Sequence, residues 1–282
     1  MKTLHTVAEM RAAVADARRV GKTIGFAPTM GALHEGHLSL VRAARARCDI
    51  VVASIFVNPT QFGPNEDFAK YPRTLERDSE QLVREQVDLL FAPSTDEMYP
   101  AGATTMVEVE GLSDRLDGKS RPGHFRGVAT VVSKLFHIVQ PDAAFFGQKD
   151  AAQCAVIRKL VRDLRIPVEI VVCPIVREPD GLAMSSRNVY LSAEERRQAL
   201  VLRRALLAVE QAYGKGERSL AALRNVAEKT FAEVPPVIID YIAIVDPDTL
   251  EPRGAAATGG ELVAVAAKIG STRLIDNIVL PQ

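Results

Sequence analysis

Hydrophobic residues follow two different spacings along the first part of the chain, and these spacings predict alternating strands and helices. Short apolar runs rich in β-branched residues, such as residues 49–59 and 168–176, are typical of buried strands. Segments with an apolar residue every three or four positions, such as residues 36–48 and 127–141, are typical of helices. This alternation predicts a parallel sheet with helices on both faces, joined by right-handed crossovers.

The same pattern predicts the individual elements. The expected strands are residues 23–28, 49–59, 87–93, 142–147 and 168–176, and the expected helices are residues 6–20, 36–48, 75–86, 127–141 and 150–164. Thr6 and Glu9 have the spacing of a capping box at the start of the first helix. Ser192 and Glu195 repeat that spacing further along, so we expect another helix to begin there.

The pattern changes near residue 177. Residues 177–192 have little regular periodicity, and two helices and three strand-like runs follow them. The sequence therefore predicts a doubly wound α/β domain at residues 1–176 and a smaller α+β domain at residues 177–282. The irregular stretch would join the two domains, and ligand sites often lie at such joints.

Charge and composition exclude several classes of function. The 282 residues carry 35 basic and 35 acidic side chains, so no overall field would attract a nucleic acid or a membrane surface. The longest apolar runs have 8 or 9 residues, whereas a membrane span needs about 20. The cysteines Cys48, Cys154 and Cys173 lack metal-ligand and redox spacing, so we expect buried thiols in a cytoplasmic protein.

The stretch PTMGALHEGHLSL, residues 28–40, places two histidines between an expected strand and an expected helix. The first turn of a helix leaves N–H groups unpaired and attracts anions, phosphate above all. Gly31 and Gly36 would let the backbone approach a ligand, and His34 and His37 would add side-chain donors on one side of the turn. Two ordinary capping histidines remain the alternative. Zinc is disfavoured because no third ligand stands nearby.

Two further loops carry groups that suit phosphate. Residues 145–153, FFGQKDAAQ, follow an expected strand, where Gly147 would permit a tight turn and Lys149 would supply a point charge. Asp150 could cap the next helix or bind a ribose hydroxyl. Residues 183–188, AMSSRN, offer hydroxyls and the guanidinium of Arg187 for a triphosphate. For each loop, an ordinary polar turn remains the alternative.

A fourth region, residues 56–78, follows the second expected strand of the sheet. Its polar candidates are Asn58, Gln61, Asp67 and Tyr71. The neutral amide of Gln61 suits a substrate that bears hydroxyl groups. Further on, Arg126 could contact an anion, whereas we expect His124 to have a structural role.

Five segments taken together resemble the pantothenate synthetase family, the pantoate–β-alanine ligases. They are residues 24–37, 58–73, 121–136, 145–153 and 183–188, and the resemblance extends over nearly the whole chain. It implies a Rossmann-like nucleotidylyltransferase domain with a lid-like C-terminal domain, and a homodimer. HEGH is similar to the HxGH signature of the wider superfamily, and MSSR is similar to its second signature.

The resemblance also implies a reaction and the residues that perform it. Pantoate and ATP, with Mg²⁺, would give an enzyme-bound pantoyl adenylate and pyrophosphate, and β-alanine would then displace AMP. The implied catalytic residues are His34, His37, Lys149, Ser185 and Arg187. The implied ATP-binding residues are Met30, Gly31, Ala32, Leu33, His34, Glu35, Gly36, His37, Gly147, Gln148, Lys149, Asp150, Val176, Met184, Ser185, Ser186 and Arg187. The implied substrate-binding residues are Gln61, Gln153, Asn58, Tyr71 and Arg126, and no protein ligand for a metal is predicted.

Two other functions stay open on the sequence. A nucleotidylyltransferase that acts on a small phosphorylated alcohol would carry HEGH equally well. Gln61 and Gln153 favour a small hydroxy acid instead, because a phosphorylated substrate would call for more arginine or lysine. A non-catalytic RNA-binding module is disfavoured by the zero net charge.

Overall fold

The computed structural model describes residues 1–64 and 66–282, so Asn65, within the 58–73 segment, lies outside the description. The chain forms two compact units. Unit 1 comprises Met1–Gly147 and Val156–Pro174, and unit 2 comprises Gln148–Ala155 and Ile175–Gln282.

A six-stranded parallel sheet forms the centre of unit 1. Its strands are β1 (Lys2–Leu4), β2 (Ile24–Thr29), β3 (Ile50–Ile55), β4 (Leu89–Phe91), β5 (Ala143–Gly147) and β6 (Glu169–Cys173), in the spatial order β1-β4-β3-β2-β5-β6. All five neighbouring pairs are parallel. The predicted α/β class is therefore confirmed, and β1 is an additional edge strand that three residues are too few to reveal by periodicity.

The connecting helices lie where right-handed crossovers require. They are α1 (Val7–Arg19), α2 (Glu35–Arg45), α3 (Leu75–Arg84), α6 (His124–Val139) and α7 (Ala151–Asp163), with the single-turn helices α4 (Thr95–Met98) and α5 (Asp117–Ser120) between them. From β2 the chain moves one way across the sheet through α2 and α3, and from β4 it returns through α6. Helices α2 and α3 therefore cover one face and α6 the other, where α6 contacts α1.

Local sequence explains where these helices begin. The Thr6–Glu9 capping box is present at α1, and the Ser192–Glu195 box is present at α8 (Ala193–Gly214), as predicted. Helix α6 is buried on nearly all sides, which agrees with its almost continuous apolar sequence.

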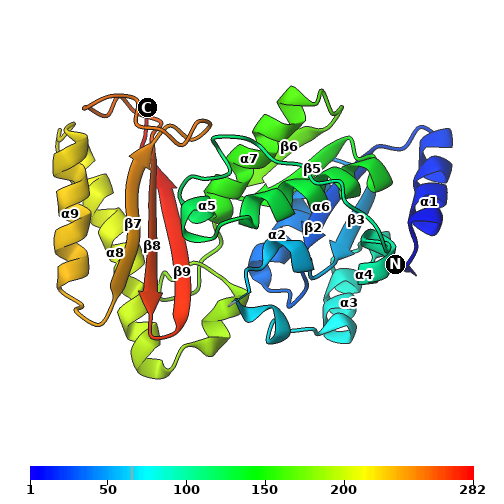
Figure 1. Ribbon diagram of the computed structural model, residues 1–282, viewed down its shortest axis with the longest axis horizontal. Helices are drawn as coiled ribbons and strands as arrows, with labels where there is room; N and C mark the ends of the chain where they lie inside the picture. The colour runs from blue at the N-terminus through cyan, green and yellow to red at the C-terminus, as the bar shows by residue number, and fades with distance from the viewer. Residues whose placement is uncertain (65) are drawn as a thin grey trace. The chain divides into compact units, whose positions relative to one another are not determined.

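Unit 2 is a smaller α+β arrangement. Helices α8 and α9 (Leu220–Ala232) pack on an antiparallel sheet of β7 (Ile238–Val245), β8 (Leu262–Ile269) and β9 (Thr272–Val279), in the order β7-β8-β9 (Figure 1). Their shared core contains Leu206, Phe231 and Val265, none more than 2% exposed.

The stretch predicted to be irregular is in part a short hairpin. Arg177 and Ala183 form an isolated antiparallel bridge, and the Met184 N–H donates to the Val176 carbonyl at 3.0 Å. Gly181 closes the turn with a φ of +93°, a conformation that side chains rarely adopt. This hairpin corrects the expectation that residues 177–192 are irregular, and it leads directly into the predicted MSSR segment. In the described residues, no helix is both long and apolar enough to cross a membrane.

Candidate functional site

The order of the strands fixes where a ligand would bind in unit 1. Connections from β2 run outward through β3 and β4, whereas β5 and β6 lie on the other side of β2. The sheet thus reverses its direction of winding between β2 and β5, which pair directly through Phe26 and Ala144. Doubly wound sheets bind ligands beyond the carboxyl ends of strands at such a reversal. The chain leaves these two strand ends into the 30–37 turn and the 148–150 turn, both predicted to bind ATP.

The 30–33 turn is held from beneath by a buried carboxylate. Asp78 of α3 is 1% exposed, and its two oxygens accept the backbone N–H groups of Ala32 and Leu33, each at 2.9 Å. Thr74 also donates its hydroxyl to Asp78 at 3.2 Å. Gly31 has a φ of +84°, and a Cβ there would lie 3.1 Å from Asp78. Ala32 and Leu33, which the resemblance implies bind ATP, thus have their backbone N–H groups engaged within the protein.

His34 and His37 form the cap of α2 with their own side chains. His34 is the N-cap residue, and its Nδ1 accepts the Gly36 N–H at 3.1 Å. The His37 Nδ1 accepts the His34 N–H at a longer 3.4 Å, which completes a reciprocal capping box. The rings stack with centroids 4.0 Å apart. The prediction that one helical turn presents both rings together is therefore confirmed.

This cap determines which ring nitrogen carries the proton. Because each Nδ1 accepts a backbone N–H, a neutral ring holds its proton on Nε2. The two Nε2–H groups are then directed donors on stacked rings of fixed orientation. Donors arranged in this way can stabilise charge that develops on a phosphate.

Next to this turn, Asn58 and Gln61 form a buried amide pair at the start and end of the 3₁₀ turn η1 (Pro59–Gln61). The Asn58 Nδ2 donates to the Gln61 Oε1 at 3.0 Å and to the Gly127 carbonyl at 3.2 Å. The Asn58 Oδ1 accepts the Tyr99 hydroxyl at 2.8 Å. The Gln61 Nε2 donates to the sulfur of Met30 at 3.1 Å. Gln61 is thus linked to the predicted nucleotide turn, whereas the amide of Asn58 mainly orients Gln61.

A second set of side chains holds the backbone of Gln61. The His124 Nδ1 donates to the Gln61 carbonyl at 2.8 Å, and its Nε2 accepts from Arg121 at 3.0 Å. Arg121 in turn makes two hydrogen bonds to Glu66, at 2.8 and 2.6 Å. Burial, assisted by the charge of Arg121, lowers the pKa of His124 to about 4. Burial alone would raise the pKa of Glu66, but the hydrogen bonds and charge of Arg121 outweigh it and lower that pKa.

Helix α6 packs directly against this turn because residue 127 is a glycine. A Cβ at Gly127 would lie 2.3 Å from the Thr60 carbonyl oxygen and 2.6 Å from the Gln61 Cα. No side chain fits there unless the turn moves. The position of Gln61 therefore depends on the absence of a side chain at Gly127, more than sixty residues away in the sequence.

The other predicted residues of unit 1 lie in different surroundings. Tyr71 is 5% exposed and packs edge-on against Phe62, so its ring belongs to an aromatic cluster. Arg126 is exposed on α6. Glu35 pairs with Arg42. The structure thus joins Gln61 to Met30 and His34 to His37, while no described contact joins Arg126 to either pair.

In unit 2, the 148–150 turn is attached to strand β9. The Asn277 Nδ2 donates to the carbonyls of Gln148 and Lys149 at 2.9 and 3.0 Å, and the Gln148 Nε2 donates to the Asn277 Oδ1 at 3.0 Å. The Lys149 ammonium lies 3.3 Å from Asp150, and its side chain is 21% exposed. Gln153 follows in the first turn of α7.

The prediction that Gly147 is needed for a tight turn is wrong in this structure. Its φ lies outside the left-handed region, and a Cβ built on it meets nothing within 4 Å. Neither a tight turn nor a close neighbour demands glycine there. Open space at the end of β5 instead leaves room for a ligand.

The MSSR segment of unit 2 is ordered by its own polar contacts. Ser185 caps the 3₁₀ turn η4 (Ser186–Tyr190), and its Oγ accepts the Arg187 N–H at 3.2 Å. Asn188 donates to Glu178 at 2.7 Å and to the Ala183 carbonyl at 3.1 Å. The backbone around Arg187 is therefore fixed to the preceding hairpin.

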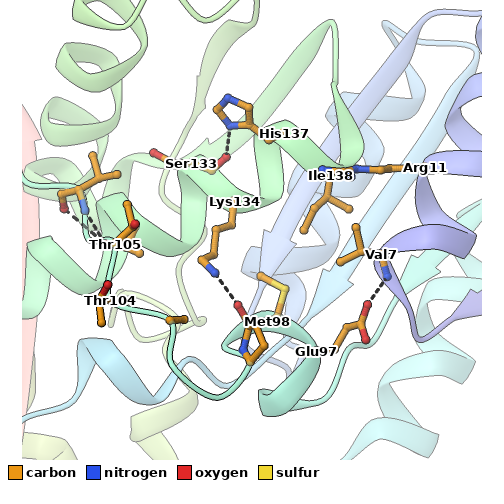
Figure 2. Close-up of a pocket in the computed structure, with 14 residues that line it drawn as sticks. Val7, Arg11, Glu97, Met98, Thr104, Thr105, Ser133, Lys134, His137 and Ile138 are labelled. Carbon is orange, nitrogen blue, oxygen red and sulfur yellow. Dashed lines mark hydrogen bonds between the residues drawn. The ribbon is translucent and has the colours of Figure 1, made fainter.

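A cavity of about 560 Å³ in unit 1 lies apart from these residues (Figure 2). Within the described chain its lining contains none of the residues predicted to bind substrate or ATP, and consists mainly of residues from α1, α6 and the 97–107 segment. Lys134, which lines it, donates to the Met98 carbonyl at 2.6 Å. Across residues 1–64 and 66–282, no group of three or more His, Cys, Asp or Glu side chains is placed to hold a metal.

Several residues that build the site were missed from the sequence. Asp78 lies on the polar helix α3, and the sequence does not distinguish this one buried acid from the solvated acids of the same helix. Arg121 and Glu66 are hydrogen-bonded although 55 positions separate them in the sequence. Asn277 gave a usable signal in the sequence, because it and Asp276 interrupt the apolar run of residues 274–280, LIDNIVL.

Comparisons with known proteins agree with this geometry. The sequence profile described as Pantoate-beta-alanine ligase matches residues 2–279. A pantothenate synthetase from Acidobacterium capsulatum is 63% identical over 293 residues, covering 100% of this chain and 98% of the relative. One from Moorella thermoacetica is 59% identical and covers 99% of each chain.

Solved structures show the same fold. The crystal structure of a pantothenate synthetase from Thermus thermophilus superposes with a TM-score of 0.95 at 51% identity, over 100% of both chains. A pantoate-β-alanine ligase from Francisella tularensis, complexed with "Beta-gamma ATP" and β-alanine, has a TM-score of 0.81 at 36% identity. That match covers 99% of this chain and 97% of the other.

Proposed function

The chain belongs to the pantoate–β-alanine ligase family, and from this premise we propose how its residues form pantothenate. Pantoate attacks the α-phosphorus of ATP, which gives an enzyme-bound pantoyl adenylate and pyrophosphate. The amine of β-alanine then attacks the acyl carbon and displaces AMP. A carboxylate is a poor electrophile towards an amine at neutral pH, so the mixed anhydride supplies the leaving group that amide formation needs.

The observation that carries this proposal is the stacked, reciprocally capped pair His34 and His37. Their Nε2–H donors follow β2 at the reversal point of the sheet, where a nucleotide binds in this class of fold. We assign them electrostatic stabilisation of the negative charge on the α-phosphate oxygens and on the departing pyrophosphate. Lys149, Ser185 and Arg187 would hold the remaining phosphate oxygens, since ammonium, hydroxyl and guanidinium groups all donate to phosphate.

Gln61 and Gln153 would bind pantoate through its hydroxyl groups and carboxylate. Support for Gln61 comes from its surroundings: the amide is oriented by Asn58, and its backbone by His124. A neutral amide in a buried site suits a hydroxy acid, and discriminates against a phosphorylated alcohol, which would need cationic partners.

Four further assignments rest on the resemblance together with chemistry. Mg²⁺ would enter bound to the ATP phosphates, as is usual for this ion, and would offset their charge. Residues 177–282 would act as a lid domain. The protein would be a homodimer built on the N-terminal domain, since symmetric dimers are the commonest oligomers. A species of 30.6 kDa in sedimentation at micromolar concentration would contradict the dimer.

A cytoplasmic location suits the buried thiols of Cys154 and Cys173.

The two half-reactions can be separated, and that separation tests the function. With pantoate, ATP and Mg²⁺ but no β-alanine, labelled pyrophosphate should exchange into ATP. With β-alanine but no pantoate, it should not. If exchange requires β-alanine, the adenylate is not a separate intermediate. If exchange proceeds with a phosphorylated alcohol instead of pantoate, the protein is a nucleotidylyltransferase of another kind.

A further inference from the structure

Strand β9 contains two adjacent polar residues, Asp276 and Asn277, that the proposed chemistry does not use directly. They are 3% and 2% exposed, and they interrupt an apolar run. Consecutive residues of a strand project to opposite faces of the sheet. Asp276 shares its face with Leu274 and Ile278, which belong to the core beneath α8 and α9, so Asn277 faces the other way.

Asn277 uses its whole amide on the turn that carries Lys149. Its Nδ2 donates both hydrogens, one to each carbonyl of Gln148 and Lys149, and its Oδ1 accepts from the side chain of Gln148. Three hydrogen bonds at 2.9–3.0 Å from one buried side chain define the path of that backbone. They touch no charged atom of Lys149, so they orient the residue without competing for its ammonium.

Asp276 holds the other loop by way of Arg177. The Arg177 guanidinium forms two hydrogen bonds to the Asp276 carboxylate, at 2.7 and 2.9 Å, and a third to the Gly181 carbonyl at 3.1 Å. Arg177 lies at the base of the hairpin that leads to Met184 and the MSSR segment. The carboxylate thus anchors the loop that carries Arg187.

We propose that Asp276 and Asn277 are positioning residues that set the two phosphate-binding loops of unit 2, the Lys149 turn and the Arg187 loop, relative to one strand. One dipeptide can serve both loops because its side chains leave opposite faces of β9. The proposal rests on the proposed function, in which Lys149 and Arg187 hold ATP. It predicts that the pair supports adenylation and is not needed once the adenylate has formed.

The test compares both half-reactions in Asn277→Ala, Asp276→Asn and Lys149→Ala. Pantoate-dependent pyrophosphate exchange should fall about 10- to 100-fold in the two strand variants, with a raised KM for ATP. In a chase, enzyme with preformed adenylate is mixed with β-alanine, and the rate of AMP release should stay within about twofold of the native rate. If Asn277→Ala does not fold, Asn277→Ser, which keeps one donor, should show a smaller loss of the same kind.

A matched control and a double variant separate positioning from general damage. Asp240→Asn neutralises a carboxylate that accepts from Arg273 in the same sheet, 2.9 Å away, and should leave both half-reactions unchanged. The double variant Lys149→Ala/Asn277→Ala should be no slower in exchange than Lys149→Ala alone, because Asn277 acts through Lys149.

Each contrary result has a distinct meaning. The positioning role would be overturned by equal losses in both half-reactions, by fully additive losses in the double variant, or by the same loss in Asp240→Asn. Normal exchange in Asn277→Ala beside impaired exchange in Lys149→Ala would overturn it while leaving the proposed function intact. Full exchange in Lys149→Ala would instead remove the proposed ATP contact, and this proposal with it.

Discussion

The two units orient their site residues in different ways. In unit 1 the functional side chains are themselves hydrogen-bonded: each Nδ1 of His34 and His37 accepts a backbone N–H, and both amide atoms of Gln61 have partners. In unit 2, Asn277 and Ser185 hold the backbone beside the predicted cations. Asn277 bonds the carbonyl of Lys149, and Ser185 bonds the N–H of Arg187.

This difference corresponds to the chemistry of the groups. An imidazole or an amide is a directional donor whose value depends on its angle, so fixing the ring or amide fixes the interaction. Lysine carries a point charge and arginine a planar fork of donors, each on a long stem, so the backbone at the base of the stem decides where the charge can reach. We therefore expect the residues of unit 1 to depend on the orientation of each ring or amide, and those of unit 2 to depend on the cation and on the backbone contacts that place it.

The largest effect should come from the histidines. His34→Ala and His37→Ala should each slow pyrophosphate exchange by roughly 10²–10³, the usual loss when a preorganised donor is removed from a developing charge. His34→Ala should also lower the free energy of unfolding by about 0.5–2 kcal/mol, because it removes the cap of α2. His34→Asn can still cap the helix, so it should lose activity without that loss of stability. A His34→Asn variant with native exchange rates would show that the imidazole is a cap and nothing more.

Removal of the charge in unit 2 should have a smaller effect on activity. Lys149→Ala should reduce adenylation well over tenfold, or by roughly 2 kcal/mol of transition-state stabilisation. Its melting temperature should barely change, because an ion pair between adjacent residues at a partly exposed position contributes little. Lys149→Arg keeps the charge and should recover part of the rate. If Lys149→Arg were as slow as Lys149→Ala, the charge of this residue would not be what supports adenylation.

The amide pair should affect pantoate more than ATP. Gln61→Ala or Gln153→Ala should raise the KM for pantoate about 2- to 10-fold, which corresponds to about 0.5–1.5 kcal/mol per lost hydrogen bond. Gly127→Ala should raise the same constant, because its methyl group must displace the Gln61 turn. Steady-state kinetics with each substrate varied would measure this. An effect confined to ATP would mean that the pantoate pocket lies elsewhere.

Stability, unlike the preceding effects on activity, should depend on pH. Below pH 6.5 the unfolded chain takes up a proton on His124, which the folded chain does not take up until pH about 4. Stability should therefore fall as pH drops through this window, by at most about 1.4 kcal/mol per pH unit. The contribution of Glu66, whose pKa is lowered, is lost only below about pH 4.5.

Urea denaturation between pH 6.5 and 4.5 would measure that dependence. His124→Asn retains a donor near the Gln61 carbonyl but cannot titrate, so its stability should vary less with pH. An identical slope in both proteins would show that His124 does not remain neutral in the folded state.

Much of the fold follows from the sequence because periodicity is a local property. The strands, the long helices and both capping boxes were predicted, and so were the turns that carry His34 and Lys149. Elements of three or four residues, such as β1 and α5, contain too few positions to show a period. The residues beneath the site were missed because they act across the chain: Asp78 reaches Leu33 across 45 positions, and Asn277 reaches Lys149 across 128. For Gly147, the sequence led to a wrong physical reason, because a glycine can mark empty space as well as a turn.

The pairing of β2 with β5 also bears on how the protein folds. Strands β2 and β3 are neighbours in sequence, but the contact between Ile24 and Asp142 that begins the β2–β5 junction closes a loop of 118 residues. Closing such a loop costs chain entropy before the new contacts can compensate for it. We expect helices and the β2–β3–β4 part of the sheet to appear first during refolding. The strand ends that carry the nucleotide turns would meet last, so a refolding chain should regain its helical content before it can bind ATP.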